Sequence, residues 1–460
     1  MTDFATLPLS PTLLQSLAAM GYARMTPVQA ASLPPLLEGR DVIAQARTGS
    51  GKTAAFGLSL LARLHVAQNH VQGLVLCPTR ELADQVSKEI RRLASATPNI
   101  KVLTLSGGIA LGPQLASLAA HDPHIVVGTP GRVQELLRKR SLHLSSLRML
   151  VLDEADRMLD MGFTEAITEI IGKTPPQRQT LLFSATWPEA IRAISAGIQR
   201  DPITVTVDGA AVQHGIEQRF FEVEPAQKMD ALAHLLRAYR TESALVFCNT
   251  RRDTREVAEA LDQRGFSALA LHGEMEQRDR DEVLVRFANR SCAVLVATDV
   301  AARGLDVHEL AAVISWELPS DPDVHVHRIG RTGRAGAKGL ALSLCTPRER
   351  ARACAIEARQ GAPLAWHTLK PAGGAGKQLA LAPMATVCID GGRKDKMRPG
   401  DILGALTGAA GLAADDVGKI DVFATRAYVA IRRNRADKAV ERLRAGTIKG
   451  RRYRVRRIGG

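Results

Sequence analysis

Short apolar runs recur along the first three quarters of the chain, and each one ends in a polar segment that contains Gly, Pro or charged residues. Apolar runs that alternate with helical stretches are typical of buried parallel strands in an α/β fold. Parallel sheets of this kind bind ligands just beyond the carboxyl ends of their strands, so the polar segments mark candidate sites. In chain order these segments are ARTGSGKT, PTREL, TPGR, DEAD, SAT, NTRR, TDVAARG and TPRER.

The alternation divides the chain into blocks. It runs through residues 1–205 and again through residues 215–360, and residues 206–214 join the two. Residues 361–383 contain Pro and Gly with little periodicity, which is typical of a linker. From residue 384 to residue 460 the order of segments reads β-α-β-β-α-β, the split βαβ arrangement. The sequence therefore predicts an α/β protein with two parallel-sheet domains followed by a small α+β domain.

The length and charge of the chain agree with this division. At 460 residues the chain is too long for one ordinary hydrophobic core. The net charge is +14, and residues 384–460 hold 18 Lys and Arg against 8 Asp and Glu. Most of the positive charge therefore lies in the last unit, and this asymmetry indicates a polyanionic partner for it.

The sequence contains no pattern for a disulfide framework, a transition-metal site or a membrane span. The six cysteines are scattered without a C-x-x-C pair, so reduced thiols are expected. No apolar run is long enough to cross a bilayer, and the start of the chain lacks the layout of a secretory signal. We expect a cytoplasmic protein that binds neither a membrane nor a transition metal.

The segment from Ala46 to Thr53 lies between a short apolar strand and a predicted helix. It fits a Walker A loop in which Ala replaces the usual first glycine. Gly49 and Gly51 would turn backbone N–H groups toward the phosphates of a nucleotide. Lys52 would reach the β- and γ-phosphates, and Thr53 would bind Mg²⁺. A chance Gly-rich turn is the alternative, and the strand-to-helix context disfavours it.

A second apolar strand, residues 149–152, ends in the carboxylates of Asp153 and Glu154. An acid in this position can bind Mg²⁺, and its neighbour can orient or deprotonate an attacking water molecule. Acids that merely stabilise a helix N-terminus are the more general interpretation. The Walker A loop reverses that preference, so we assign Asp153 to the metal and Glu154 to general base catalysis.

The second block carries Arg331 and Arg334, three residues apart on a Gly-flanked backbone. Arginines of this kind can reach across a cleft to a γ-phosphate and neutralise the charge that develops during hydrolysis. A solvated basic turn is the alternative. Because the second block has no Gly-Lys-Thr sequence of its own, we expect it to complete the nucleotide site with these arginines. A motor or a switch would work in this way.

Taken in chain order, these segments resemble the DEAD-box ATP-dependent RNA helicases over residues 1–360. The resemblance rests on the polar segments quoted above and on further matches at Gly21-Tyr22, Thr26-Pro27 with Gln29, Gly107-Gly108, and HRIGRTGR at 327–334. It implies two tandem RecA-like domains with ATP between them and RNA across one face of both. It also implies that RNA contacts go mainly to phosphate and sugar, so that this core reads no sequence.

The resemblance extends the set of site residues, with ATP and Mg²⁺ as cofactors. Nucleotide contacts are implied for Phe4, Arg24, Gln29, Ala46, Arg47, Thr48, Gly49, Ser50, Gly51, Lys52, Thr53 and, at the ribose, Asp306. Coupling of the nucleotide state to RNA is implied for Asp156, Ser184, Thr186 and His327. Contacts to the RNA backbone are implied for Thr79, Arg80, Gly108, Thr129, Arg132, Thr250 and Thr298.

The last unit resembles an RNA-recognition motif whose sheet has few aromatic residues. Cys388 takes a position where a stacking ring is usual, Arg426 takes another, and only Tyr428 remains aromatic. A platform ring normally contributes about 1–3 kcal/mol to RNA binding, so charge must compensate. The expected RNA contacts are Arg393, Lys394, Lys396, Arg426, Tyr428, Lys449, Arg451, Arg452 and Arg454.

A DEAD-box core with such a tail resembles one bacterial branch of the family. The resemblance implies binding to a hairpin of large-subunit (23S) ribosomal RNA and a role on pre-50S particles during assembly of the 50S subunit. We expect a monomer. A nonspecific basic anchor is the alternative for the tail. For the whole chain, the alternatives are an ATP-gated RNA clamp or assembly scaffold with general RNA targets, and a DNA-directed helicase, which the SAT and Gln29 segments disfavour.

Overall fold

The computed structural model describes residues 3–46, 50–120, 122–184, 186–187, 189–206, 215–239, 243–302, 310–333, 339–369, 382–408 and 411–459. Contacts between residues divide the chain into two compact units. The first holds the described residues up to Thr206, and the second holds those from Gly215 onward.

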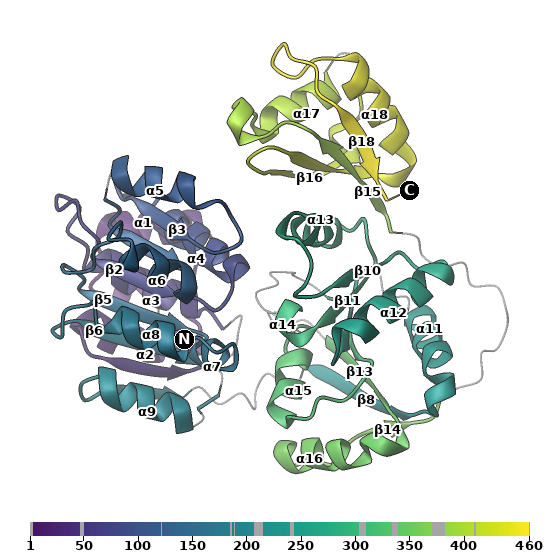
Figure 1. Cartoon of the computed structure of the whole chain (residues 1–460), viewed down its shortest axis with the longest axis horizontal. Helices are drawn as coiled ribbons and strands as arrows, with labels where there is room; N and C mark the ends of the chain where they lie inside the picture. Colours follow the sequence, from purple (N-terminus) through teal and green to yellow (C-terminus); the bar gives the residue numbers. More distant parts are fainter. Residues whose placement is uncertain are drawn as a thin grey trace. The chain divides into compact units, whose positions relative to one another are not determined.

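Among the described residues of the first unit, seven strands form a parallel sheet in the order β3-β4-β2-β5-β6-β1-β7 (Figure 1). The strands are β1 (Val42–Gln45), β2 (Gly73–Leu76), β3 (Val102–Leu105), β4 (Ile125–Gly128), β5 (Met149–Asp153), β6 (Gln179–Ser184) and β7 (Ile203–Thr206). The helices are α1 (Pro11–Ala19), α2 (Pro27–Glu38), α3 (Lys52–Ala62), α4 (Arg80–Leu93), α5 (Leu111–Ala120), α6 (Pro130–Arg138), α7 (Ala155–Asp160), α8 (Thr164–Ile171) and α9 (Glu189–Ile198).

Successive residues of these strands belong to two separate hydrophobic cores, one on each face of the sheet. In β2, Val75 lies in the core that contains Phe56 of α3, whereas Leu74 and Leu76 lie in the core that contains Leu136 of α6. Side chains along a strand point alternately to opposite faces, so a strand covered by helices on both sides is apolar at every position. This burial explains why the runs in the sequence are continuously apolar.

The second unit begins with a parallel sheet of the same kind. Among its described residues, seven strands take the order β10-β11-β9-β12-β13-β8-β14. The strands are β8 (Ile216–Glu222), β9 (Ala244–Cys248), β10 (Ala268–Leu271), β11 (Val294–Thr298), β12 (Ala312–Ser315), β13 (Gly339–Cys345) and β14 (Trp366–His367). The helices are α11 (Lys228–Ala238), α12 (Arg251–Gln263), α13 (Gln277–Ala288), α14 (Asp299–Ala302), α15 (Pro322–Ile329) and α16 (Arg350–Gln360).

The second sheet extends beyond residue 360, into the segment expected as a linker. β14 pairs in parallel with β8, and the indole ring of Trp366 lies against Phe220 and beneath the guanidinium of Arg350. These ring contacts hold the strand at the edge of the sheet. The remainder of the expected linker, residues 370–381, and the joining segment 207–214 lie outside the described residues.

The last part of the chain is a small α+β domain, as the sequence predicts. β15 (Met384–Ile389), β16 (Val417–Val422), β17 (Ala427–Arg432) and β18 (Val455–Ile458) form an antiparallel sheet in the order β16-β17-β15-β18. α17 (Pro399–Thr407) and α18 (Ala436–Ala445) cover one face of it (Figure 1). Val387 and Val429 of the sheet share a core there with Ile402 of α17 and Leu443 of α18.

The opposite face of this small sheet lies against α13 of the preceding parallel-sheet domain. Cys388 and Tyr428, which are paired across β15 and β17, form an apolar cluster with Val285 of α13. Next to this cluster, the Nδ2 of Asn289 donates a hydrogen bond of 3.0 Å to the Oγ1 of Thr386, which is fully buried. The small domain therefore packs on the preceding parallel-sheet domain through the face where an RNA-recognition motif usually stacks bases.

Two global properties follow from the described residues. All six cysteines have free thiols, and five of them are buried. In the described part of the chain, no helix combines the length and the apolar character that crossing a bilayer requires.

Candidate functional site

The loop before α3 is shaped by contacts with the start of α2. Gly51 adopts a left-handed conformation with φ 93°, and a Cβ at this position would lie 2.5 Å from the Nε2 of Gln29. Gln29 donates from Nε2 to the carbonyl of Gly51 (3.1 Å), and the Oγ1 of Thr26 donates to the carbonyl of Ser50 (2.8 Å). The fully buried Gln29 thus connects the segment expected at the adenine to the phosphate loop.

Lys52 begins α3, and its ammonium lies at the carboxyl end of β5. Its Nζ forms an ion pair of 3.5 Å with the Oδ1 of Asp153, and both side chains are almost completely buried. Neither atom makes a hydrogen bond within the described part of the chain. Burial raises the pKa of Asp153 to about 6, and Glu154 adds to this shift whereas Lys52 opposes it.

A buried ammonium and a buried carboxylate oxygen without hydrogen bonds are costly, unless a ligand supplies partners. Triphosphate oxygens would satisfy Lys52, and a divalent cation would satisfy Asp153. Thr53 follows in the first turn of α3 and is half-buried. The donor set of Lys52, Thr53 and Asp153 therefore fits the Mg²⁺-nucleotide expected from the sequence.

Glu154 is held in an unusual backbone conformation directly after β5. Its φ of 55° lies in the left-handed region, which costs free energy for a residue with a side chain. Its Oε2 accepts a hydrogen bond of 2.7 Å from the Nη1 of Arg157, and both side chains are buried. Arg157 was not expected from the sequence, although its position three residues after Glu154, at the start of α7, places it on the same side of the chain.

The residues expected to couple nucleotide and RNA meet at the ends of β5 and β6. The Oδ2 of Asp156 accepts hydrogen bonds from the backbone N–H and the Oγ1 of Thr186, both of 2.9 Å. The backbone N–H of Asp156 donates to the Oγ of Ser184 (3.3 Å). The two segments are therefore joined by side-chain contacts.

The expected RNA contacts of the first unit follow three other strands. Thr79 caps the N-terminus of α4 after β2, Gly108 follows β3 with φ 74°, and the Oγ1 of Thr129 after β4 accepts from the N–H of Gly107 (3.3 Å). Arg132 donates from Nη2 to the carbonyl of Ile109 (3.0 Å). Since β3, β4 and β2 are neighbours, these residues lie along one half of the carboxyl edge of the sheet.

The strand order thus separates two groups of residues along one edge. The residues expected to bind the nucleotide, or to couple it to RNA, follow β1, β5 and β6, which are neighbours in the sheet. The residues expected to contact RNA follow β2, β4 and β3, which are neighbours too. Phe4 is buried and contacts Tyr22 edge-on, with ring centroids 6.2 Å apart. Arg47, Thr48, Gly49, Asp306 and Arg334 lie outside the described residues.

The second unit places its expected RNA residues at the ends of adjacent strands. Thr250 follows β9 and caps α12 through its Oγ1, which accepts from the N–H of Asp253 (3.1 Å). Thr298 ends β11, which pairs with β9. Arg331 follows α15 and is 5% exposed, and His327 lies on α15 itself. These residues belong to the second unit, and the Lys52 site belongs to the first.

Most of the basic residues expected to contact RNA lie on two turns of the small domain. Lys449 donates from Nζ to the carbonyl of Lys396 (2.9 Å) and forms an ion pair of 3.2 Å with Asp401, so the two turns meet. Tyr428 is 2% exposed because it packs against α13, and it has no room to stack a base. Arg426 is paired with Asp390 (3.4 Å). The exposed basic residues of the two turns are Arg393, Lys394, Lys396, Lys449, Arg451, Arg452 and Arg454.

Three family models match the chain. Residues 26–194 match the DEAD/DEAH box helicase model, residues 227–336 match the helicase conserved C-terminal domain, and residues 386–457 match the DbpA RNA binding domain. Together with the relatives described next, these matches show that the chain belongs to the DEAD-box family of ATP-dependent RNA helicases. The prediction of two RecA-like domains and a small RNA-binding domain is confirmed.

The chain is similar to a known relative over nearly its whole length. The chain is 55% identical to the ATP-dependent RNA helicase DbpA of Escherichia coli (strain K12) over 457 residues, 99% of both chains. It is 46% identical to the DEAD-box ATP-dependent RNA helicase CshA of Bacillus cereus over 350 residues, 76% of this chain and 66% of the relative. The solved structure of Saccharomyces cerevisiae Dbp5 bound to RNA and ADP BeF3 has a TM-score of 0.72, with 30% identity over 80% of this chain and 96% of that one. The bacterial branch expected from the tail is thus the DbpA type.

Proposed function

We propose that this RNA helicase uses its last domain to bind a hairpin of large-subunit ribosomal RNA, and that it remodels this RNA locally during assembly of the 50S subunit. It would act in the cytoplasm as a monomer. The observation that carries the proposal is the pair of basic turns joined by Lys449, on a domain whose sheet face is covered by α13. A hairpin gripped from outside suits such turns better than a threaded single strand does.

In the nucleotide site, Lys52 would bind the phosphates, and Thr53 and Asp153 would hold Mg²⁺, which would neutralise phosphate charge there. Glu154 orients the attacking water and accepts its proton, and the contact with Arg157 keeps its carboxylate in place. Arg331 and Arg334 of the second unit stabilise the charge that develops on the transferred phosphoryl group. Hydrolysis would then release the RNA.

The proposal is tested by comparing ATP hydrolysis stimulated by the ribosomal hairpin with that stimulated by an unrelated duplex of equal length. The wild-type chain is expected to need much less hairpin than duplex for half-maximal stimulation. Replacing Lys449, Arg451 and Arg452 together by alanine should remove this preference, whereas the matched change Lys438→Ala at an exposed position of α18 should not. Equal stimulation of the wild-type chain by both RNAs would refute the choice of substrate.

Displacement of a short duplex separates the helicase from an ATP-gated clamp. The helicase should release the strand of a duplex attached to the hairpin in the presence of ATP. A chain that hydrolyses ATP and holds the RNA without any strand release would instead act as a clamp.

A further inference from the structure

Asn249 lies at the carboxyl edge of the second sheet, between a strand end and an expected RNA contact. It follows β9, and its neighbour Thr250 caps α12. Both residues are exposed. β9 lies between β11 and β12 in the sheet, so the ends of all three strands surround this position.

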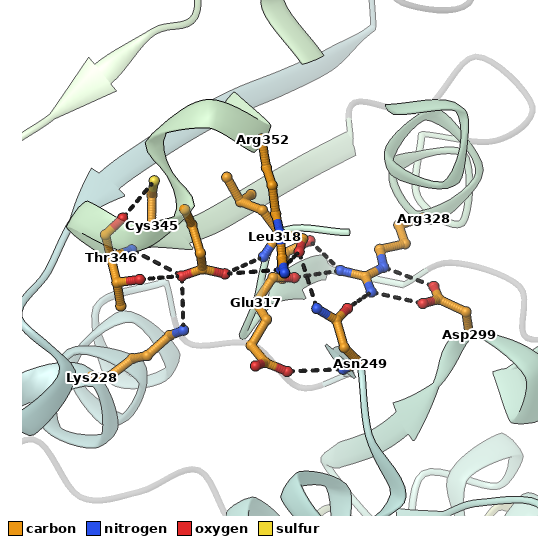
Figure 2. A network of polar contacts seen from close by, with 11 residues as sticks. Lys228, Asn249, Asp299, Glu317, Leu318, Arg328, Cys345, Thr346 and Arg352 are labelled. Atoms are coloured by element: carbon orange, nitrogen blue, oxygen red, sulfur yellow. Dashed lines mark hydrogen bonds and ion pairs between the residues drawn. The ribbon is translucent and has the colours of Figure 1, made fainter. Parts of the chain in front are cut away.

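Three hydrogen bonds fix Asn249 to two other segments (Figure 2). Its backbone N–H donates to the Oε2 of Glu317 (3.0 Å), and its Nδ2 donates to the carbonyl of Leu318 (3.1 Å). Its Oδ1 accepts from the Nη2 of Arg328 (2.7 Å). The side-chain amide thus uses its donor and its acceptor on different partners, which a carboxylate or a hydroxyl of similar size cannot do in the same geometry.

Arg328 carries this connection toward the nucleotide-binding arginine. It lies on α15 with 1% exposure, three residues before Arg331. Its guanidinium donates to both carboxylate oxygens of Asp299 at 2.7 Å and to the carbonyl of Glu317 at 2.6 Å. Asp299 directly follows Thr298, another expected RNA contact. The position of Arg328 therefore depends on the ends of β9, β11 and β12 at once.

The backbone of Leu318, whose carbonyl accepts from Asn249, is fixed by further hydrogen bonds. The N–H of Leu318 donates to the Oε1 of Glu349 (2.8 Å), whose Oε2 accepts from the Nζ of the buried Lys228 (3.3 Å). Arg352 donates from Nη1 to the same Leu318 carbonyl (2.8 Å). These hydrogen bonds fix the backbone of Leu318. The bond from Asn249 to the Leu318 carbonyl therefore restrains the position of the neighbouring Thr250.

We propose that Asn249 is a positioning residue that couples RNA contact at Thr250 to the placement of Arg328 and, through α15, of Arg331. This inference rests on the proposed roles of Thr250 and Arg331. RNA that binds at Thr250 restrains the turn after β9. The hydrogen bond from Arg328 to the side-chain amide of Asn249 transmits this restraint to α15. Asn249 thereby contributes to the stimulation of ATP hydrolysis by RNA, without contact to either ligand.

The same contacts make the inference testable without unfolding the domain. If Asn249 is replaced, Arg328 still has Asp299 and the Glu317 carbonyl as partners, and the Leu318 carbonyl still has Arg352. An exposed side chain whose partners remain satisfied has a small effect on stability. The amide therefore serves the geometry of the site more than the stability of the fold.

The test compares the full-length chain with Asn249→Ala and Asn249→Asp, and with Arg352→Ala as the matched control at the same carbonyl. ATP hydrolysis is measured over a range of RNA concentrations, with the ribosomal hairpin and with an unrelated single-stranded RNA. Both Asn249 variants should need about five- to tenfold more RNA for half-maximal stimulation, on either RNA. Their hydrolysis without RNA and their melting temperature should stay close to those of the wild type, as should every value for Arg352→Ala.

A second comparison places Asn249→Ala in a Thr250→Ala background. If Asn249 acts through Thr250, most of its effect on the RNA requirement should vanish there. An equal effect in both backgrounds, or a parallel loss of RNA-free hydrolysis and of melting temperature, would overturn the proposal. The choice of ribosomal RNA is judged separately, because it depends on the difference between the two RNAs and not on the effect of Asn249.

Discussion

At the scale of single residues, the nucleotide site is distinguished by polar groups that the protein leaves unsatisfied. Lys52 and Asp153 could be predicted because the Walker A loop and the acid after β5 are local patterns. Their mutual distance and burial could not, since these depend on how β1, β6 and β5 are ordered in the sheet. The strained conformation of Glu154 and its contact with Arg157 likewise have no local signal.

Lys52→Ala should lower RNA-stimulated ATP turnover by about a hundred- to a thousandfold, because the phosphates lose their buried countercharge. Steady-state hydrolysis at saturating RNA measures this, with Lys139→Ala at the exposed end of α6 as the matched control. Turnover at the wild-type rate would disprove the assignment of the phosphate loop.

Binding of the Mg²⁺-nucleotide should weaken as the pH falls below about 6. Burial raises the pKa of Asp153 from 3.8 to about 6, so the carboxylate that we propose to hold the metal is protonated in this range. Binding is measured by calorimetry from about pH 5 to about pH 8. The nucleotide phosphates titrate in the same way with Asp153→Asn, but binding to this variant should lack the part of the pH dependence that comes from Asp153. Identical pH dependence of binding for the wild type and the variant would contradict the role of Asp153.

The raised pKa of Asp153 affects the stability of the nucleotide-free protein in the opposite direction: stability falls as the pH rises, whereas nucleotide binding strengthens. The folded state binds the Asp153 proton more tightly than the unfolded state does. The contribution of this group to the free energy of unfolding therefore decreases as the pH rises from about 4 to about 6.

At the scale of secondary-structure elements, the strands and their order within each block follow from the sequence more readily than the packing between blocks. Continuous apolar runs predict buried parallel strands, and each polar segment marks a strand end. The contact of β15 with α13 left no such signal, because it joins residues 97 positions apart along the chain, as Asn289 and Thr386 are. The lack of a stacking ring at Cys388 predicts weak RNA stacking, and the structure adds that this face is packed against α13.

Thr386→Val should lower the free energy of unfolding by about 1–3 kcal/mol, because the buried side chains of Asn289 and Ser291 would lose a shared partner. Denaturant unfolding of the full-length chain measures this. Thr425→Val at an exposed turn is the matched control. An unchanged stability would show that the contact between the small sheet and α13 contributes little.

At the scale of the whole molecule, the basic turns belong to the same unit as Arg331, and Lys52 belongs to the other unit. RNA that binds the turns would therefore be attached to the unit that contains Arg331.

Removal of residues 384–460 should leave ATP hydrolysis measurable but weaken binding of the ribosomal hairpin. The logarithmic salt dependence of the affinity should become shallower by about 0.9 for each lost phosphate contact. Fluorescence anisotropy at several salt concentrations measures the slope, and a melting curve shows whether the shortened chain stays folded. A slope equal to that of the full-length chain would argue against electrostatic binding of RNA by residues 384–460.

The packing of the small sheet on α13 bears on how such helicases can be recombined. Transferred alone to another helicase core, the tail would expose Cys388 and Tyr428 to solvent and lose the partner of Thr386. A chimera designed for a new RNA target should therefore carry Val285 and Asn289 together with the tail. The small sheet and the α13 surface on which it packs should therefore be transferred together.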